Sequence, residues 1–251
     1  IIPHLVVTAD PMSPTLEGFK NIDLHDVPLA CPYSAYPEIV SKFSGRVLTW
    51  STFNPIIDAL RSRTGRKPGT KILEKGTVSG CVLDLSRLFG CKKVMFIGQD
   101  MSVRDDGRYY TNDSSYSDSG SHYTNNMSGQ RLPGNTQEKV IVEGRLFVYL
   151  KTFEQFISAN KSVEYRNLAR TGAKINGAPY VTYDEAFEWI GNTSNISFRD
   201  KVEELISNQL TDFNLEDILS STTSFIYKLL NLSLSAAIET ELLPDKFSGT
   251  N

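Results

Sequence analysis

The chain has 251 residues, of which 40% are hydrophobic and 22% are charged, and its formal net charge is -3. This balance is typical of a globular protein with a substantial core, and it excludes a predominantly disordered chain. The charge gives no electrostatic footprint for nucleic acid, and no stretch holds the ~18 consecutive apolar residues of a membrane helix. We therefore expect neither a nucleic-acid partner nor a membrane span.

The cysteines and the start of the chain bear on where the protein is found. Cys31, Cys81 and Cys91 are odd in number and widely spaced, so they predict free core thiols in a reducing, cytoplasmic compartment, with neither a disulfide framework nor a zinc site. The segment beginning at Ile1 has no initiating Met, no basic stretch and no long apolar stretch, so it is not a signal peptide. We expect further residues to precede it.

The first fifty residues predict three strands and one helix. Apolar runs indicate strands at residues 5–9, 27–30 and 46–50, and the first of these ends at Asp10 because Pro11 and Pro14 prevent its continuation. A short helix is expected at residues 37–43. Pro37 would lie in its first turn, where the missing N–H costs nothing.

A helix and a further strand follow. Residues 77–89 carry apolar side chains at helical spacing, and Gly90 is placed to end that helix. Residues 94–97 are apolar at every position, which is expected of a parallel strand covered on both faces. The order strand, helix, strand predicts an α/β fold built on a doubly wound, mostly parallel, Rossmann-like sheet.

The second half of the chain is less informative. Residues 111–130 are rich in Ser, Asn, Asp and Gly, which predicts a long loop that is either a mobile lid or disordered. A helix is expected at residues 145–157. We predict an α/β domain over residues 1–197 and a helical C-terminal segment over residues 198–251, which either packs on the sheet or offers an apolar face to a partner.

Polar residues follow two of the predicted strands. Ligands bind at the carboxyl ends of parallel strands, where Asp10 and the trio Gly98, Gln99 and Asp100 stand, so we expect both strand tips to meet in one pocket. Gly98 permits close backbone approach, and Gln99 offers a donor and an acceptor. Asp100 can accept hydrogen bonds from sugar hydroxyls or hold an incoming nucleophile. The alternative for Asp100 is that it caps a following turn.

The opposite wall of that pocket is expected at the start of the helix over residues 77–89. Its unpaired N–H groups and the hydroxyls of Thr77 and Ser79 suit a phosphate or a carboxylate. Ordinary helix capping by Thr77 explains the same residues.

A metal site is an alternative use of the acidic residues. Asp100, Asp105 and Asp106 would hold Mg²⁺ and a diphosphate, but Asp105 and Asp106 followed by glycine also form an ordinary turn, which we favour. The three histidines, His4, His25 and His122, have no ligand spacing. His122, in the 111–130 loop, is either a mobile base or a solvated side chain.

Three stretches together resemble a known family. They read "KGTVSGCVLDLSRLFGCKKVMFIGQDMSVRDDGRYY", "EGRLFVYLKTFEQFI" and "YRNLARTGAKINGAPY", and their order and spacing resemble the motility-associated factor (Maf) glycosyltransferases. The opening "PHLVVTADP" is also similar to a strand of that family. The resemblance runs from about residue 3 to residue 186, and its most specific motifs are Gly98-Gln99-Asp100 and Thr171-Gly172-Ala173.

The resemblance implies a sialyltransferase-like fold and a reaction. A nonulosonic, sialic-acid-like sugar would pass from a CMP-activated donor to Ser or Thr hydroxyls of flagellin, with no further cofactor. Asp100 would be the base, and Gln99 would help it to hold the donor or the acceptor. The remaining site residues implied in this way bind the substrate: Asp10, Thr77, Ser79, Gly98, Asn167, Thr171 and Gly172.

The chain departs from the family pattern at four places. Thr77-Val78-Ser79 stands where the family usually has Ser-Val-Ala. Arg170 stands where the family has an acid, and Tyr109 and Tyr110 stand where it has a histidine. The family's Gly-x-Gly-Pro-Ser nucleotide loop precedes the point at which this chain begins. A sheet without the corresponding strand would expose an edge, so we expect weakened nucleotide binding or self-association into a homo-oligomer.

Two other functions remain open. An archaeal branch of the same superfamily, the 6-hydroxymethylpterin diphosphokinases, resembles the sequence too, and such an enzyme would use ATP with Mg²⁺ bound by Asp100, Asp105 and Asp106. The other alternative is a non-catalytic accessory module that binds flagellin or glycan, in which the helical segment docks a partner.

Overall fold

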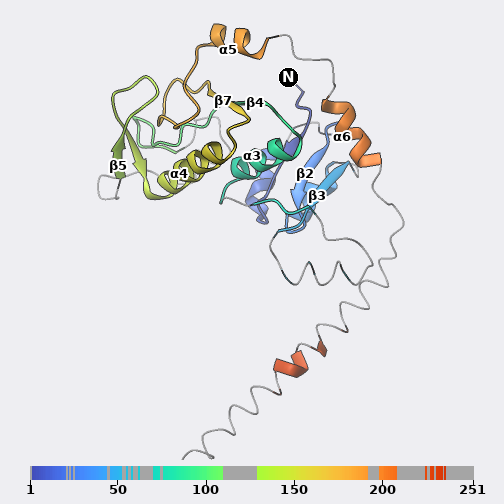
Figure 1. Cartoon of the computed structure of the whole chain (residues 1–251). Helices are drawn as coiled ribbons and strands as arrows, with labels where there is room; N and C mark the ends of the chain where they lie inside the picture. The colour runs from blue at the N-terminus through green and yellow to red at the C-terminus, as the bar shows by residue number, and fades with distance from the viewer. Residues whose placement is uncertain are drawn as a thin grey trace, which may run out of the picture. The chain divides into compact units, whose positions relative to one another are not determined.

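In the computed structural model the chain alternates short strands with helices (Figure 1). By its internal contacts it divides into two units, residues 1–52 with 71–207 and residues 53–70 with 208–251. Every element named below belongs to the first unit. The structure describes residues 2–20, 22, 24, 26–43, 46–52, 55, 58, 62, 70–73, 76–109, 129–191, 198–207, 224, 227, 228, 230–233 and 235.

The first fifty residues form a parallel sheet in the order β1-β2-β3. Its strands are β1 (Val6–Val7), β2 (Leu29–Pro32) and β3 (Val47–Trp50). All four residues of β2 are buried, as expected of a parallel strand covered on both faces. The helix α1 (Pro37–Ser41) and the 3₁₀ helix η1 (Ser13–Phe19) flank this sheet, and α1 starts at a proline as predicted.

The chain returns beside β3 after residues 53–70. Ser51 and Lys71 form a parallel bridge, and the N–H of Ile72 donates to the carbonyl of Ser51 at 3.4 Å. The segment is fixed by Asp84, whose buried carboxylate accepts from the N–H of Leu73 at 3.1 Å and from Arg87 at 2.9 Å. Asp84 therefore joins this segment to the following helix.

That helix, α3 (Val78–Leu88), leads into a second parallel pair of strands. Gly90 follows it with a φ of 74°, which agrees with its predicted role at the helix end. β4 (Lys93–Phe96) pairs with β7 (Glu164–Asn167), and Phe96 lies beside Asn167 at their carboxyl ends. The predicted strand extended to Ile97, but Ile97 is 71% exposed because the chain turns at Gly98.

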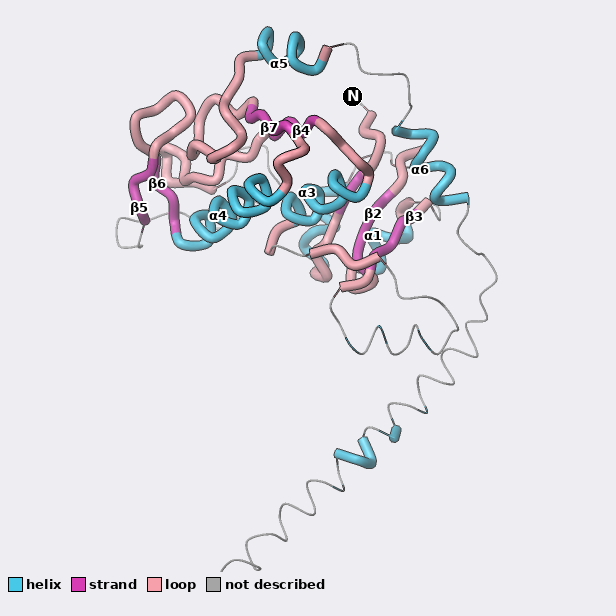
Figure 2. Tube along the Cα trace, in the orientation of Figure 1, coloured by secondary structure: helices cyan, strands magenta, loops and turns pink. Residues whose placement is uncertain are grey.

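An antiparallel pair precedes the longest described helix. β5 (Gly129–Leu132) pairs with β6 (Val140–Glu143), and β6 continues directly into α4 (Gly144–Ala159), as Figure 2 shows. The prediction of a loop through residue 130 is therefore wrong at its end, because residues 129 and 130 obtain their hydrogen bonds from β6. Residues 111–128 of that loop, with His122, lie outside the described residues, as does His25.

The end of the first unit is helical. α5 (Tyr183–Ile190) begins with a capping box between Thr182 and Glu185, and α6 (Phe198–Ser207) buries Val202 completely. Arg46 beside β3 forms an ion pair with Glu203 of α6. Residues 198–207 of the predicted helical segment therefore pack on the sheet, and the boundary after residue 197 stays a prediction.

The predicted α/β class, with parallel strands and flanking helices, is confirmed. The assigned strands form three separate ladders, two parallel and one antiparallel, and no ladder between described residues joins β1 to β4. Each parallel ladder has its own core. Phe43 and Ile39 pack beneath β2, whereas Phe153 of α4 packs against Phe96 at the end of β4.

Candidate active site

The site begins where β4 and β7 end. Because these strands are parallel and Phe96 pairs with Asn167, the segments that follow them leave the same edge of the ladder. Gly98 turns the first segment with a φ of 70°, and the N–H of Leu168 in the second donates to the carbonyl of Phe96 at 2.9 Å. The two most specific motifs of the sequence therefore start side by side.

Gly172 packs directly against Asp100. The N–H of Ala173 donates to the carbonyl of Asp100 at 2.7 Å, and Gly172 has a φ of 104°. A Cβ on Gly172 would lie 2.4 Å from the carbonyl oxygen of Asp100, closer than a side chain can approach. Glycine is therefore required at 172 by both the backbone angle and the contact.

A third segment, residues 133–137, holds the loop of residues 168–173. The side-chain amide of Asn135 donates to the carbonyls of Ala169 at 2.9 Å and Thr171 at 3.4 Å, and its backbone N–H donates to the carbonyl of Gly172 at 2.9 Å. The hydroxyl of Thr136 donates to the carbonyl of Arg170 at 3.0 Å. Sequence analysis missed this segment, although "PGNT" is a turn sequence that could have drawn attention to it.

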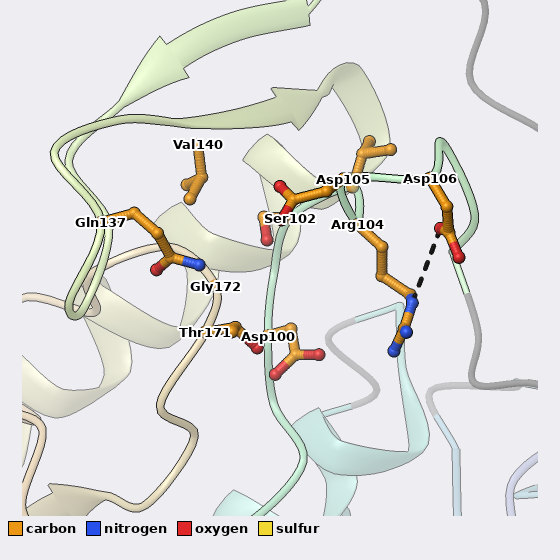
Figure 3. A pocket seen from close by; sticks show the side chains of 10 residues that line it. Asp100, Ser102, Arg104, Asp105, Asp106, Gln137, Val140, Thr171 and Gly172 are labelled. Carbon is orange, nitrogen blue, oxygen red and sulfur yellow. Dashed lines mark ion pairs between the residues drawn. The ribbon is translucent and has the colours of Figure 1, made fainter.

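These segments enclose a cavity of about 280 Å³, called the Asp100 cavity below. Figure 3 shows Ser102 and Gln137 on one side of the chain segment that carries Asp100, and Arg104 with Asp106 on the other. The lining residues are Asp100, Ser102, Val103, Arg104, Asp105, Asp106, Gln137, Val140, Thr171 and Gly172.

Met101 sets the direction of the residues on either side of it. Its φ of 50° is the one positive value among the described non-glycine residues, and its side chain is only 7% exposed within the core around Phe153. Asp100 before it and Ser102 after it both face the cavity. A left-handed residue that is not glycine stores strain, and such strain concentrates at functional sites.

The carboxylate of Asp100 has no hydrogen-bond partner among the described residues. Burial raises its pKa above the ordinary value of an aspartate, and the nearby Arg104 guanidinium opposes part of this rise. A carboxylate whose pKa is raised towards neutrality is a better proton acceptor than one held at its ordinary value. Asp100 can therefore take a proton from a hydroxyl group bound in the cavity.

Asp105, Asp106 and Gly107 form a turn, as the favoured interpretation predicted. The N–H of Gly107 donates to the carbonyl of Arg104 at 2.9 Å, and the N–H of Arg108 donates to the carboxylate of Asp106 at 3.0 Å. That hydrogen bond, with the guanidinium groups of Arg104 and Arg108, lowers the pKa of Asp106. In the described part of the chain, no group of three His, Cys, Asp or Glu residues is arranged to hold a metal ion.

The predicted site residues do not all line one cavity. Asp100, Thr171 and Gly172 line the Asp100 cavity. Ser79 and Gln99 line a second hollow of about 250 Å³, whose other lining residues are all apolar. Whether Ser79 and Gln99 contact a substrate stays a prediction.

Two further predicted residues have structural partners. The hydroxyl of Thr77 accepts from the N–H of Gly80 at 2.9 Å, which is the capping role considered as the alternative. The carboxylate of Asp10 accepts from the N–H of Met12 at 2.9 Å, and Asp10 lines neither cavity. The expectation that Asp10 and Asp100 share a pocket therefore gains no support.

Asn167 and Gly98 shape the site from the strand ends. Asn167 is completely buried, and its side-chain oxygen accepts from the N–H of Ala169 at 3.0 Å, so it sets the course of the loop of residues 168–173. Its side-chain nitrogen has no partner among the described residues. Gly98 has open space around it. Direct contact of either residue with a substrate stays a prediction.

The three cysteines and His4 line neither of the two cavities described above. All three cysteines are free, and burial raises the pKa of Cys31 to about 11. His4 packs edge-on against Phe198 at a ring separation of 6.4 Å.

None of the helices that the structure describes has the length and apolar character needed to span a bilayer.

Comparison with known proteins shows that this fold is similar to that of a Maf glycosyltransferase. A solved structure titled as the Maf glycosyltransferase from Magnetospirillum magneticum AMB-1 matches with a TM-score of 0.58 and 14% sequence identity. The match covers 82% of this chain and 30% of that one, so this chain spans less than a third of the enzyme's length. The predicted resemblance to the Maf family is thereby supported at the level of the fold.

A family model gives a second indication. The model described as 6-hydroxymethylpterin diphosphokinase MptE-like matches residues 1–106, which include β1 to β4 and Asp100. A search of curated proteins finds no match.

Proposed function

We propose that this chain is the sugar-transferring part of a glycosyltransferase and that Asp100 is its general base. The observation that carries the proposal is the partly buried, unpartnered carboxylate of Asp100, held by Gly172 and Ala173 in a cavity at the ends of two parallel strands. The fold similarity to a Maf glycosyltransferase supports this reading.

In the proposed reaction the donor is a CMP-activated nonulosonic sugar and the acceptor is a Ser or Thr hydroxyl of flagellin. Asp100 accepts the hydroxyl proton while the acceptor oxygen forms a bond to the anomeric carbon. The bond from that carbon to the phosphate oxygen breaks, and its electron pair leaves with CMP. The proposal includes a cytoplasmic location, which the free cysteines favour.

Transfer by an Asp100→Asn variant tests the role of the carboxylate. The amide cannot accept the proton, so we expect transfer from a CMP-activated sugar to a flagellin substrate to fall by about 10²- to 10⁴-fold. Asp184→Asn is a matched control, because Asp184 lies in the first turn of α5 and does not line the cavity. Wild-type transfer by Asp100→Asn would exclude this carboxylate as the base.

The match to the diphosphokinase model favours a second candidate, pyrophosphoryl transfer from ATP to a pterin. Its Mg²⁺ would need Asp100, Asp105 and Asp106. These residues line one cavity, but Asp106 is paired with Arg104 at 3.6 Å and the described residues form no metal-binding cluster, so they do not fit the ion.

Thermal stabilisation by ligands separates the candidates. CMP should raise the melting temperature under the first proposal, and ATP with Mg²⁺ should raise it under the second. A chain stabilised by neither would point to the accessory module that binds flagellin or glycan. Light scattering tests the expected self-association, for which the described edge of β1 provides a surface.

A further inference from the structure

Ser102 is a buried polar residue that the proposed reaction does not use. It is 7% exposed and lines the Asp100 cavity, and its hydroxyl has no hydrogen-bond partner among the described residues. Its position is fixed on both sides, because Met101 and Val103 are buried and the N–H of Val103 donates to the carbonyl of Ile141 at 2.9 Å. The backbone of Ser102 is therefore held at the wall of the cavity.

A second polar side chain lines the same cavity. The side-chain oxygen of Gln137 is buried without a partner, and Gln137 lines the same cavity. Figure 3 shows Gln137 and Ser102 on the side of the cavity away from Arg104 and Asp106. Buried polar groups are normally hydrogen-bonded, and leaving one unsatisfied destabilises the fold. The unsatisfied amide of Gln137 and the hydroxyl of Ser102 both belong to residues that line the hollow, so a ligand there meets two side chains that can form hydrogen bonds.

The chemistry of this side of the cavity selects the ligand. A hydroxyl and an amide both donate and accept, so they match another hydroxyl group, and Val140 adds an apolar surface. An anionic carboxylate or phosphate would need a cation. Among the described lining residues the cation is Arg104, which is paired with Asp106 at 3.6 Å on the other side.

The volume of the cavity also favours a small ligand. About 280 Å³ lies just below the range of roughly 300–1,000 Å³ for small-molecule sites, which favours one residue or one ring over a whole nucleotide sugar.

We propose that Ser102 and Gln137 form an acceptor subsite for an uncharged, hydroxyl-bearing side chain, so that the Asp100 cavity receives the acceptor peptide and the CMP donor binds outside it. This inference rests on the proposed glycosyl transfer. It assigns Ser102 the role of recognising the Ser or Thr residue whose hydroxyl Asp100 deprotonates.

Direct binding of a neutral peptide tests the subsite without any donor. The probe is the capped peptide acetyl-Gly-Gly-Thr-Gly-Gly-amide, observed by saturation-transfer NMR at its Thr methyl group, with an Ala-containing peptide as the blank. Ser102→Ala should weaken binding of the Thr peptide by about 2- to 10-fold, which is the effect of one hydrogen bond. Ser158→Ala is the control, because Ser158 bonds to Gln155 and does not line this cavity.

The variant should keep its fold, since Ser102 makes no hydrogen bond within the described structure. Its urea midpoint should equal or exceed that of the wild type, and CMP affinity should not change. If Ser102→Ala fails to fold, the same measurement uses Ser102→Cys. This variant keeps nearly the same shape, but its thiol is only a weak hydrogen-bond donor.

Three outcomes would overturn the subsite: unchanged binding of the Thr peptide to the variant, a loss of CMP affinity in its place, or binding of neutral N-acetylglucosamine but not of the Thr peptide. A chain that binds the Thr peptide through Ser102 yet transfers no CMP-activated sugar would instead refute the proposed function and leave the subsite standing.

Discussion

The close contact between Gly172 and Asp100 predicts how much stability the protein loses when a Cβ atom is added at residue 172. In Gly172→Ala the new Cβ would lie 2.4 Å from the carbonyl oxygen and 2.7 Å from the Cα of Asp100. Both atoms belong to the backbone, so no side-chain rotation can relieve the contact. The variant must move the turn at Asp100, the loop of residues 168–173, or both.

The expected loss of stability has two parts. A non-glycine residue in a left-handed conformation costs about 1–2 kcal/mol, and the φ of 104° at Gly172 lies beyond the left-handed region that alanine tolerates best. Forcing an extra carbon into a packed contact adds roughly 1–3 kcal/mol. Together they predict a decrease of about 2–5 kcal/mol in the free energy of unfolding.

Gly98→Ala measures the cost of the left-handed backbone conformation alone. Gly98 also has a positive φ, of 70°, but nothing lies within 4 Å of its added Cβ, so this variant should lose only about 1–2 kcal/mol. Urea unfolding followed by circular dichroism measures both variants. If Gly172→Ala is no less stable than Gly98→Ala, the close approach of residue 172 to Asp100 does not exist in solution.

Two other predictions concern the same cavity. Because burial raises the pKa of Asp100, the folded wild type binds more protons than the unfolded chain as pH rises above the ordinary aspartate pKa. The free energy of unfolding of the wild type, relative to that of Asp100→Asn, should therefore fall as pH rises from about 4 through the pKa of Asp100 in the folded state. Urea titrations at several pH values measure this difference. A rise with pH would contradict the burial of this carboxylate. Asn135→Ala removes the side-chain hydrogen bonds to the carbonyls of Ala169 and Thr171, so it should lower the free energy of unfolding by about 1–3 kcal/mol. An unchanged free energy of unfolding would show that residues 133–137 do not hold the loop of residues 168–173.

Local patterns predicted much of the fold. The helices α1, α3 and α4 appear where apolar spacing and proline or glycine signals placed them, because those signals act within one turn of the chain. The sequence placed Gly172 in the site with Asp100 only through the family resemblance, because β7, which brings them together by pairing with β4, was not predicted.

The remaining features depend on contacts between distant residues. β5 has little apolar character, and it becomes a strand by pairing with β6, which a window of sequence does not reveal. Ser102 faces the cavity because Met101 adopts a positive φ, and an unbranched residue gives no signal of that angle. The strand-tip rule did not bring Asp10 into the cavity, because the described ladder of β1 is separate from that of β4.

The bridge between Ser51 and Lys71 limits how far residues 53–70 can be shortened. The bridge is parallel, so the chain that leaves after Ser51 must cross back and enter Lys71 from the opposite end of the pairing. A crossover between parallel strands needs about a dozen or more residues. Protein engineers who replace residues 53–70 should therefore keep a connection of about that length, and the sequence of the Asp100 cavity then stays intact.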